Sequence, residues 1–396
     1  MLAGVAVVAV GAVVVMTQDD DGSDDGGGGG GGDGQKPRNG WIDGTRENSH
    51  RLATDGKAVC GTGINKTLFC YDAATGDERW ATELRSDIAG SPTIVDGLVL
   101  AADDGKSGRD GLYAYDLDGK QVWTARIDVH DRELEPLWVP VAGDTVAAID
   151  AGIGVPAELI GTDVATGKEL WQAFTDHEDG VAQISNFSPV LSDGARFYVT
   201  TETMPDFGPG DEPPLGPSMT LVAIDPKTGK EVWSYVITEG STSFPVATEV
   251  AAFDDGSATA FIIQSGGGPG NVVVLDSATG KPRWDVPLTS PESTVAHAGG
   301  VTVVADDATM HGYAADGKEL WEKPVPDQLG VGLGNLVVRE GRVFLASYDV
   351  VEINPTSGAS AKVAEGVSAA DVVIAGDRLV LSTMSDIRAM PLPDPP

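Results

Sequence analysis

The feature that most constrains the fold of this chain is a short motif that recurs along most of its length. Each copy consists of an apolar-rich run, usually an Asp, a two- or three-residue turn, a Gly, polar residues and a Trp. Six clear copies end at Trp80, Trp123, Trp171, Trp233, Trp284 and Trp321, and a seventh, residues 350–362, has lost its Trp. Such periodicity indicates an architecture built from copies of one small unit.

Each copy of the motif predicts a β-hairpin. The apolar-rich run is expected to be a strand, and the Asp can accept hydrogen bonds from backbone N–H groups of the turn. The Gly supplies the positive φ that closes the turn, and the Trp on the return strand is suited to packing between neighbouring units. The turn residues with these structural roles are Asp72, Asp116, Asp163, Asp225, Asp276, Gly76, Gly119, Gly167, Gly229, Gly280 and Gly317.

A second series of turns precedes these hairpins and completes the unit. Its eight members lie at residues 55–56, 96–97, 143–144, 193–194, 255–256, 299–300, 340–341 and 376–377, each between apolar strands. Each unit therefore has four strands, A to D, at the spacing of ~40–50 residues typical of a propeller blade. The sequence predicts an all-β fold, an eight-bladed β-propeller of four-stranded antiparallel blades.

There are eight turns in the second series but only seven hairpins in the first. This missing hairpin predicts how the ring closes. The chain ends in PLPDPP, which cannot form a D strand after the last three strands. Trp41 precedes the first A strand and resembles an orphan Trp of a D strand. We expect the segment at residues 37–42 to complete the last blade, which removes exposed sheet edges. A seven-bladed ring is the alternative if the decayed unit is not a blade.

The N-terminal residues predict a tether. Residues 1–16 are almost purely apolar, slightly shorter than the ~20 residues of a membrane helix. They are predicted to be a membrane anchor of the signal-anchor type, with its basic flank expected upstream; a buried strand is the alternative. Residues 17–36 form a Gly- and Asp-rich flexible linker, and residues 37–396 form the propeller. This organisation predicts a cell-membrane protein whose propeller lies on the extracytoplasmic side.

Charge narrows the classes of partner. The chain carries 60 acidic and 26 basic residues, a formal net charge of -34. Nucleic acid is excluded as a partner, because phosphate neutralisation needs clustered Lys and Arg. The remaining partner classes are a protein or a small ligand.

The Trp hairpins resemble the repeat of the PQQ-binding-like β-propellers. That superfamily includes quinoprotein alcohol dehydrogenases, BamB-type scaffolds of outer-membrane assembly and the sensor propellers of receptor serine/threonine kinases. The resemblance covers residues 41–396 and implies the fold, but the motif residues are structural in every branch. The dehydrogenases hold their quinone with a vicinal cysteine pair, a stacking Trp and Ca²⁺, whereas Cys60 and Cys70 lie ten residues apart here. No catalytic residue, PQQ site or Ca²⁺ site is therefore carried over, and we expect no enzyme activity.

The two cysteines have a structural interpretation. Cys60 lies on strand B and Cys70 on strand C of the first blade, and a hairpin turning near Asn65 would place them opposite each other. This is within disulfide reach, and such a bond persists outside the cell. Two buried free thiols are the alternative.

Candidate binding residues fall in the long B–C and D–A connections, which share one face of the ring. Acidic and histidine side chains in two neighbouring D–A loops have the oxygen-rich character of a Ca²⁺ site, although solvated acidic loops are the favoured alternative. These weak metal candidates are Asp128, His130, Asp131, Asp176, His177 and Asp179. Candidate partner-binding residues are Trp138, Asp206, Phe207, Asp211 and Glu212.

Together these features predict a non-catalytic, membrane-tethered extracytoplasmic propeller. It would act as a protein-interaction scaffold or a ligand-sensing module through its B–C and D–A loops. The alternatives are a PQQ-dependent oxidoreductase and the sensor portion of a receptor serine/threonine kinase.

Overall fold

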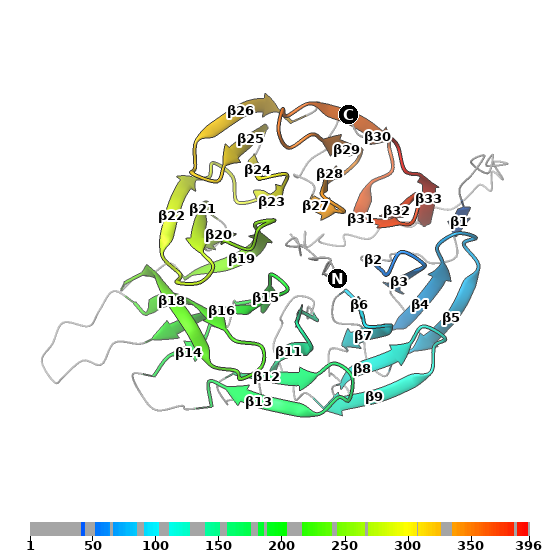
Figure 1. Cartoon of the computed structure of the whole chain (residues 1–396), viewed down its shortest axis with the longest axis horizontal. Helices are drawn as coiled ribbons and strands as arrows, with labels where there is room; N and C mark the ends of the chain where they lie inside the picture. Colours follow the sequence, from blue (N-terminus) through cyan, green and yellow to red (C-terminus); the bar gives the residue numbers. More distant parts are fainter. Residues whose placement is uncertain are drawn as a thin grey trace, which may run out of the picture.

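The fold is a closed ring of eight antiparallel β-sheets, each a blade (Figure 1). The computed structural model describes residues 41–43, 52–63, 66–84, 91–102, 111–126, 139–150, 157–175, 181–185, 188–203, 216–239, 244–265, 268–306, 308–325, 335–383 and 386–394. All regular elements within these ranges are strands. None of the described residues belongs to a helix long and apolar enough to cross a membrane.

The first four blades follow the chain from the inner strand outward. Blade 1 comprises β2 (Leu52–Thr54), β3 (Ala58–Gly63), β4 (Thr67–Asp72) and β5 (Glu78–Glu83). Blade 2 comprises β6 (Thr93–Val95), β7 (Leu98–Ala102), β8 (Gly111–Asp116) and β9 (Gln121–Arg126). Blade 3 comprises β10 (Val141–Ala142), β11 (Thr145–Asp150), β12 (Glu158–Asp163) and β13 (Glu169–Ala173). Blade 4 comprises β14 (Gln183–Ile184), β15 (Leu191–Ser192), β16 (Phe197–Thr203), β17 (Ser218–Ile224) and β18 (Glu231–Thr238).

The remaining blades repeat this order. Blade 5 comprises β19 (Pro245–Ala252), β20 (Ala258–Ser265), β21 (Gly268–Asp276) and β22 (Pro282–Pro287). Blade 6 comprises β23 (Thr294–Ala298), β24 (Val301–Asp306), β25 (Thr309–Ala314) and β26 (Glu319–Pro324). Blade 7 comprises β27 (Asn335–Arg339), β28 (Arg342–Ala346), β29 (Val350–Ile353) and β30 (Ser360–Ala364). Blade 8 comprises β31 (Ala369–Ala375), β32 (Arg378–Thr383), β33 (Ile387–Pro391) and β1 (Trp41–Asp43).

Blade 8 confirms the predicted closure of the ring. The N-terminal β1 pairs antiparallel with β33, with Trp41 opposite Ala389 and Asp43 opposite Ile387. The outermost strand of the last blade therefore comes from the start of the chain (Figure 1). The decayed unit forms a complete four-stranded blade 7, which excludes the seven-bladed alternative.

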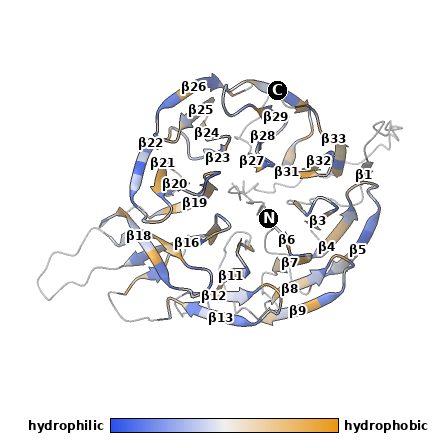
Figure 2. Cartoon of the chain, in the orientation of Figure 1, coloured by the Kyte–Doolittle hydropathy of each residue, from blue (hydrophilic) through white to orange (hydrophobic). Residues whose placement is uncertain are grey.

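The apolar core is divided among the blade interfaces. Successive residues of a strand face opposite sides of its sheet, so each blade buries apolar side chains against both neighbours. The described residues form eight apolar clusters, one between each neighbouring pair of blades, the pair of blades 8 and 1 included. The outermost strands β5 and β26 are mainly hydrophilic, whereas the interior β4 is mainly hydrophobic (Figure 2).

The motif Trp side chains join each blade to the next. Trp171 of blade 3 donates its indole N–H to the carbonyl of Pro226 in blade 4, at 2.7 Å. Its ring lies against Gly229 of the same turn, where a Cβ atom would come within 2.5 Å of the ring. Equivalent indole hydrogen bonds link Trp80, Trp123, Trp233, Trp284 and Trp321 to the following blade.

The Asp residues organise the C–D turns. The carboxylate of Asp225 accepts hydrogen bonds from the backbone N–H groups of Lys227 and Thr228 and from the Thr228 hydroxyl. Asp72, Asp116, Asp163 and Asp276 accept equivalent backbone bonds in their own turns. The predicted structural role of these Asp side chains is therefore the one they have in the fold.

Two blades depart from the simple repeat. In blade 4 the inner strand is divided, and both β14 and β15 pair with β16, which makes a five-stranded sheet. In blade 7 Lys362 aligns with the missing Trp in the sequence, but in the sheet Ala361 takes its place, opposite Glu352. There the buried Glu352 accepts two hydrogen bonds from Arg342, at 2.6 and 2.5 Å. The blade without the motif Trp thus contains a charged pair between its middle strands.

The cysteines are joined as expected. Cys60 and Cys70 lie directly opposite each other on β3 and β4 and form a disulfide. Both are fully buried in the apolar cluster between blades 1 and 2. The alternative of two free thiols is excluded.

Candidate binding face

The strand order separates two faces of the ring. Successive connections in an antiparallel sheet alternate between its two ends, so the A–B and C–D turns share one face. The B–C and D–A connections share the other, which we call the loop face. The weak metal candidates Asp128, His130, Asp131, Asp176, His177 and Asp179 come from segments of the sequence that connect strands B to C or D to A, as do Trp138, Asp206, Phe207, Asp211 and Glu212. All eleven lie outside the described residues, so the structure does not bring them together or separate them.

The described part of the loop face lies mainly on blades 5 to 8 and is organised by buried aspartates. Asp306, at the end of β24, accepts hydrogen bonds from the backbone N–H groups of Thr289 and Ser290 and from the Ser293 hydroxyl. These three residues belong to the D–A connection between blades 5 and 6. One buried carboxylate therefore fixes the shape of that connection.

Asp349 has the same role in blade 7. Its carboxylate accepts a hydrogen bond from the backbone N–H of Gly366 at 2.6 Å and forms an ion pair with Lys362 at 2.8 Å. The hydrogen bond from Lys362, with that from Gly366, lowers the pKa of Asp349, and the same contact raises the pKa of Lys362. Beside this pair the aromatic side chain of Tyr348 is 52% exposed. Phe244, which precedes β19, is a second exposed aromatic side chain on the described part of this face.

Blade 8 contributes a third buried carboxylate. Asp386 accepts a hydrogen bond from the Thr383 hydroxyl and binds the guanidinium of Arg388 through both oxygens, each at 2.7 Å. The contact with Asp386 raises the pKa of Arg388. These three described carboxylates are therefore engaged in holding loops, and none of them is arranged for general acid–base catalysis.

Polar side chains near the centre of the ring also serve the fold. Glu249 on β19 is buried and accepts hydrogen bonds from Thr294 and from the Val295 backbone in blade 6. Asp371 on β31 accepts a hydrogen bond from the Leu52 backbone in blade 1. These bonds join inner strands of neighbouring blades.

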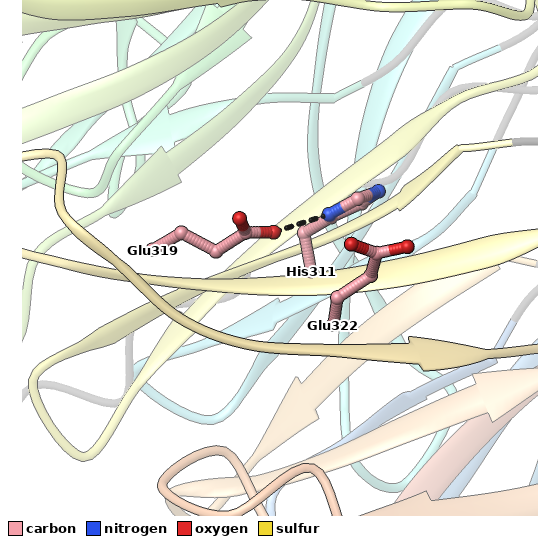
Figure 3. A group of neighbouring side chains, drawn as sticks. All are labelled: His311, Glu319 and Glu322. Atoms are coloured by element: carbon pink, nitrogen blue, oxygen red, sulfur yellow. Dashed lines mark hydrogen bonds and ion pairs between the residues drawn. The ribbon is translucent and has the colours of Figure 1, made fainter.

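The described residues contain one group that could hold a metal ion, and it is not among the candidates that the sequence predicts. His311, Glu319 and Glu322 lie together on the outer hairpin of blade 6, β25 and β26 (Figure 3). The signal for it was present, because the position of His311 is apolar in the aligned hairpins of the other Trp-bearing blades.

The ring of eight blades is closed, and its motif Trp residues join each blade to the next. These features define the chain as a β-propeller of the PQQ-like repeat class. A family model described as outer membrane protein assembly factor BamB matches residues 34–204, 154–262 and 218–384. The chain therefore belongs to this family, which confirms the resemblance seen in the hairpins.

Individual relatives agree with this assignment. The outer membrane protein assembly factor BamB of Burkholderia pseudomallei (strain K96243) is 27% identical over 346 residues, covering 83% of this chain and 80% of that protein. Among solved structures, Saccharomyces cerevisiae Sqt1 matches with a TM-score of 0.61 at 12% identity, covering 91% of this chain and 100% of that one. The quinohemoprotein alcohol dehydrogenase of Comamonas testosteroni matches with a TM-score of 0.57 at 13% identity, covering 88% and 76%. These two structures share the fold alone.

Proposed function

We propose that this chain is a non-catalytic, membrane-tethered extracytoplasmic propeller that acts as a protein-interaction scaffold. Its task would be the one named by its family, the assembly of outer membrane proteins. The observation that carries this proposal is the family match, which extends over nearly all of the ring. The contacts of the motif residues support a non-catalytic role. Each motif Trp, Asp and Gly whose contacts are described holds blades or turns together.

The loop face is the proposed site of partner binding. Its connections vary in length from blade to blade, whereas the turns of the opposite face are short and uniform. Variable loops on a rigid scaffold are where binding surfaces usually lie. Tyr348 adds an exposed aromatic side chain, a residue type enriched in protein interfaces.

A photo-crosslinking experiment tests this assignment in cells. A benzoylphenylalanine at position 348 should capture a defined envelope protein, which mass spectrometry identifies and a binding assay with both purified proteins verifies. The matched control carries the same group at the exposed Lys230, on a C–D turn of the opposite face. Equal capture from both positions would contradict the choice of face.

Activity assays separate the scaffold from the oxidoreductase alternative. The full chain, incubated with PQQ and Ca²⁺, is expected to reduce no electron-accepting dye in the presence of alcohols. Dye reduction that depends on PQQ would replace the scaffold proposal by a dehydrogenase.

The proposed tether consists of the apolar residues 1–16 and the linker 17–36. The full chain should remain in the membrane fraction after carbonate extraction, and a chain lacking residues 1–16 should be released. External protease should reach the propeller in spheroplasts. Protection of the propeller from the protease would contradict its proposed extracytoplasmic location.

A further inference from the structure

The outer hairpin of blade 6 brings one imidazole and two carboxylates together. His311 on β25 lies directly opposite Glu322 on β26, and Tyr313 lies opposite Glu319. The His311 Nδ1 and the Glu319 Oε1 are 2.8 Å apart, and one ligand atom from each of the three residues lies within 4.8 Å of the others. Figure 3 shows both carboxylates directed toward the His311 ring.

A β-bulge produces this arrangement. Residues three apart in a regular strand point to opposite faces, so Glu319 and Glu322 would normally diverge. The pairing of β25 with β26 skips Leu320, because Gly312 pairs with Trp321 and Tyr313 pairs with Glu319. The extra residue changes the alternation and puts both glutamates on the face of His311.

The histidine distinguishes blade 6 from the other hairpins. The same bulge recurs in the five other Trp-bearing blades, and a Glu equivalent to Glu319 recurs in three of them. The position of His311, however, is occupied elsewhere by Phe69, Tyr113, Ile160, Val222 and Val273. Among these hairpins, blade 6 alone combines a metal-binding side chain at this position with two carboxylates around it.

Two lysines flank the group in the sequence, Lys318 in the turn and Lys323 on β26, and Lys323 does not neutralise its charge. Lys323 follows Glu322 and therefore points to the other face of the sheet, where its Cγ lies near Gly358 of blade 7. His311 is 22% exposed and Glu319 is 44% exposed, so an ion can reach the three ligand atoms from solvent.

We propose that His311, Glu319 and Glu322 form a binding site for a divalent transition-metal ion of the zinc type. Nitrogen and carboxylate oxygen are both ligands of Zn²⁺, and three protein ligands with water in the remaining position make a common site. Ligands of one zinc ion lie about 3–4 Å apart, which the exposed carboxylates reach by small rotations. The ion would cross-link β25 and β26, and the site is independent of the partner-binding proposal.

Calorimetric titration of the full chain in detergent with ZnCl₂ tests this site. A background of MgCl₂ occupies the many weak carboxylate positions of this acidic protein. One zinc ion should bind, and His311→Phe or Glu322→Gln should weaken its affinity at least tenfold. Glu231→Gln is the control for removing a carboxylate from this bulge, because Glu231 holds the place of Glu319 in blade 4, opposite Ile224, and should leave zinc binding unchanged.

Two further readouts make the result decisive. Zn²⁺ should raise the thermal midpoint of the natural chain but not of the His311→Phe chain, since binding to the folded state stabilises it. Co²⁺ should give visible absorption that the two variants lose. If His311→Phe fails to fold, the nearly isosteric Glu322→Gln still tests whether zinc binds at this site. Zinc binding that is absent from the natural chain, or retained by Glu322→Gln, would overturn the site.

Discussion

Gly229 illustrates how tightly single residues of the motif are constrained. Its backbone is left-handed, with φ of 67°, and the Trp171 ring of blade 3 occupies the space where a Cβ would lie. Gly229→Ala should destabilise the fold by about 1 kcal/mol through backbone strain. Crowding of the ring should add about 1–3 kcal/mol.

A second glycine separates the two effects. Gly256 has φ of 68°, but no other group lies within 4 Å of the position that a Cβ would take, so Gly256→Ala reports the backbone strain alone. Urea denaturation of both variants gives the difference in unfolding free energy that is due to the Trp171 contact. Equal losses of unfolding free energy would show that the Trp contact contributes nothing.

Arg283 provides a prediction that depends on pH. Its guanidinium lies 3.0 Å from Asp276, and this hydrogen bond, with that of Thr279, lowers the pKa of Asp276 to about 2. A depressed folded-state pKa stabilises the fold above the unfolded carboxyl pKa of ~3.9, and the contribution is lost as pH falls through about 2.

Arg283→Leu should therefore lower the urea midpoint near neutral pH, and the difference should shrink between pH 4 and 2. Leu is the residue of blades 3 and 6 at this place, so it fits the strand. Val232→Leu at the equivalent position of blade 4 removes no ion pair and serves as the control. A difference that is independent of pH would contradict the role of Asp276.

At the scale of elements, the disulfide fixes the central strands of blade 1. Cys60 and Cys70 close a short loop between β3 and β4. Replacing both by Ala should cost about 2–3 kcal/mol, as expected from the chain entropy of the unfolded state. Calorimetry of the variant and of the reduced natural chain should give the same fall in melting temperature. No change on full reduction would contradict this contribution.

The charged pair of blade 7 is a second element-scale feature. Glu352 is buried, and Arg342 also donates to the carbonyl of Pro393, which ties the C-terminal segment to this blade. Glu352→Ala leaves the partly buried guanidinium of Arg342, 14% exposed, without its carboxylate partner and should cost up to about 3 kcal/mol. The double variant with Arg342→Leu should cost less than Glu352→Ala alone in urea denaturation, and a larger loss would refute the explanation.

The sequence predicts the strands of every unit, the decayed one included, but not all of the contacts between them. The Asp, Gly and Trp positions locate the C–D hairpins because each residue type has one local task. The Arg342–Glu352 pair was not predicted, since it joins residues ten apart on different strands of a unit that lacks its Trp. His311, Glu319 and Glu322 were missed because the bulge at Leu320 reverses the expected alternation.

At the scale of the whole molecule, closure was predictable by counting. Trp41 belongs to no hairpin of its own, and the last blade lacks a D strand. The pairing of β1 with β33 explains both, because β1 is that D strand. The candidate binding residues cannot be located by counting, because the loops on the loop face follow no repeat, and they stay predictions.

Truncation tests the contribution of closure. A chain lacking residues 1–43 exposes the edge of β33, whereas a chain lacking residues 1–40 keeps β1. The first should melt at a lower temperature and form oligomers through its open edge, and the second should keep the closed ring and the oligomeric state of the natural chain. Calorimetry and size-exclusion chromatography compare them. Indistinguishable behaviour would show that β1 is dispensable.

The place of β1 also has a mechanical consequence. Any pull transmitted from residues 1–40 enters the ring through three residues whose hydrogen bonds run to β33. These bonds run perpendicular to the strands, so a pull away from β33 acts along them and would break them one after another. The first part to open under load would be the seam between the start and the end of the chain, while the seven other blades stay folded.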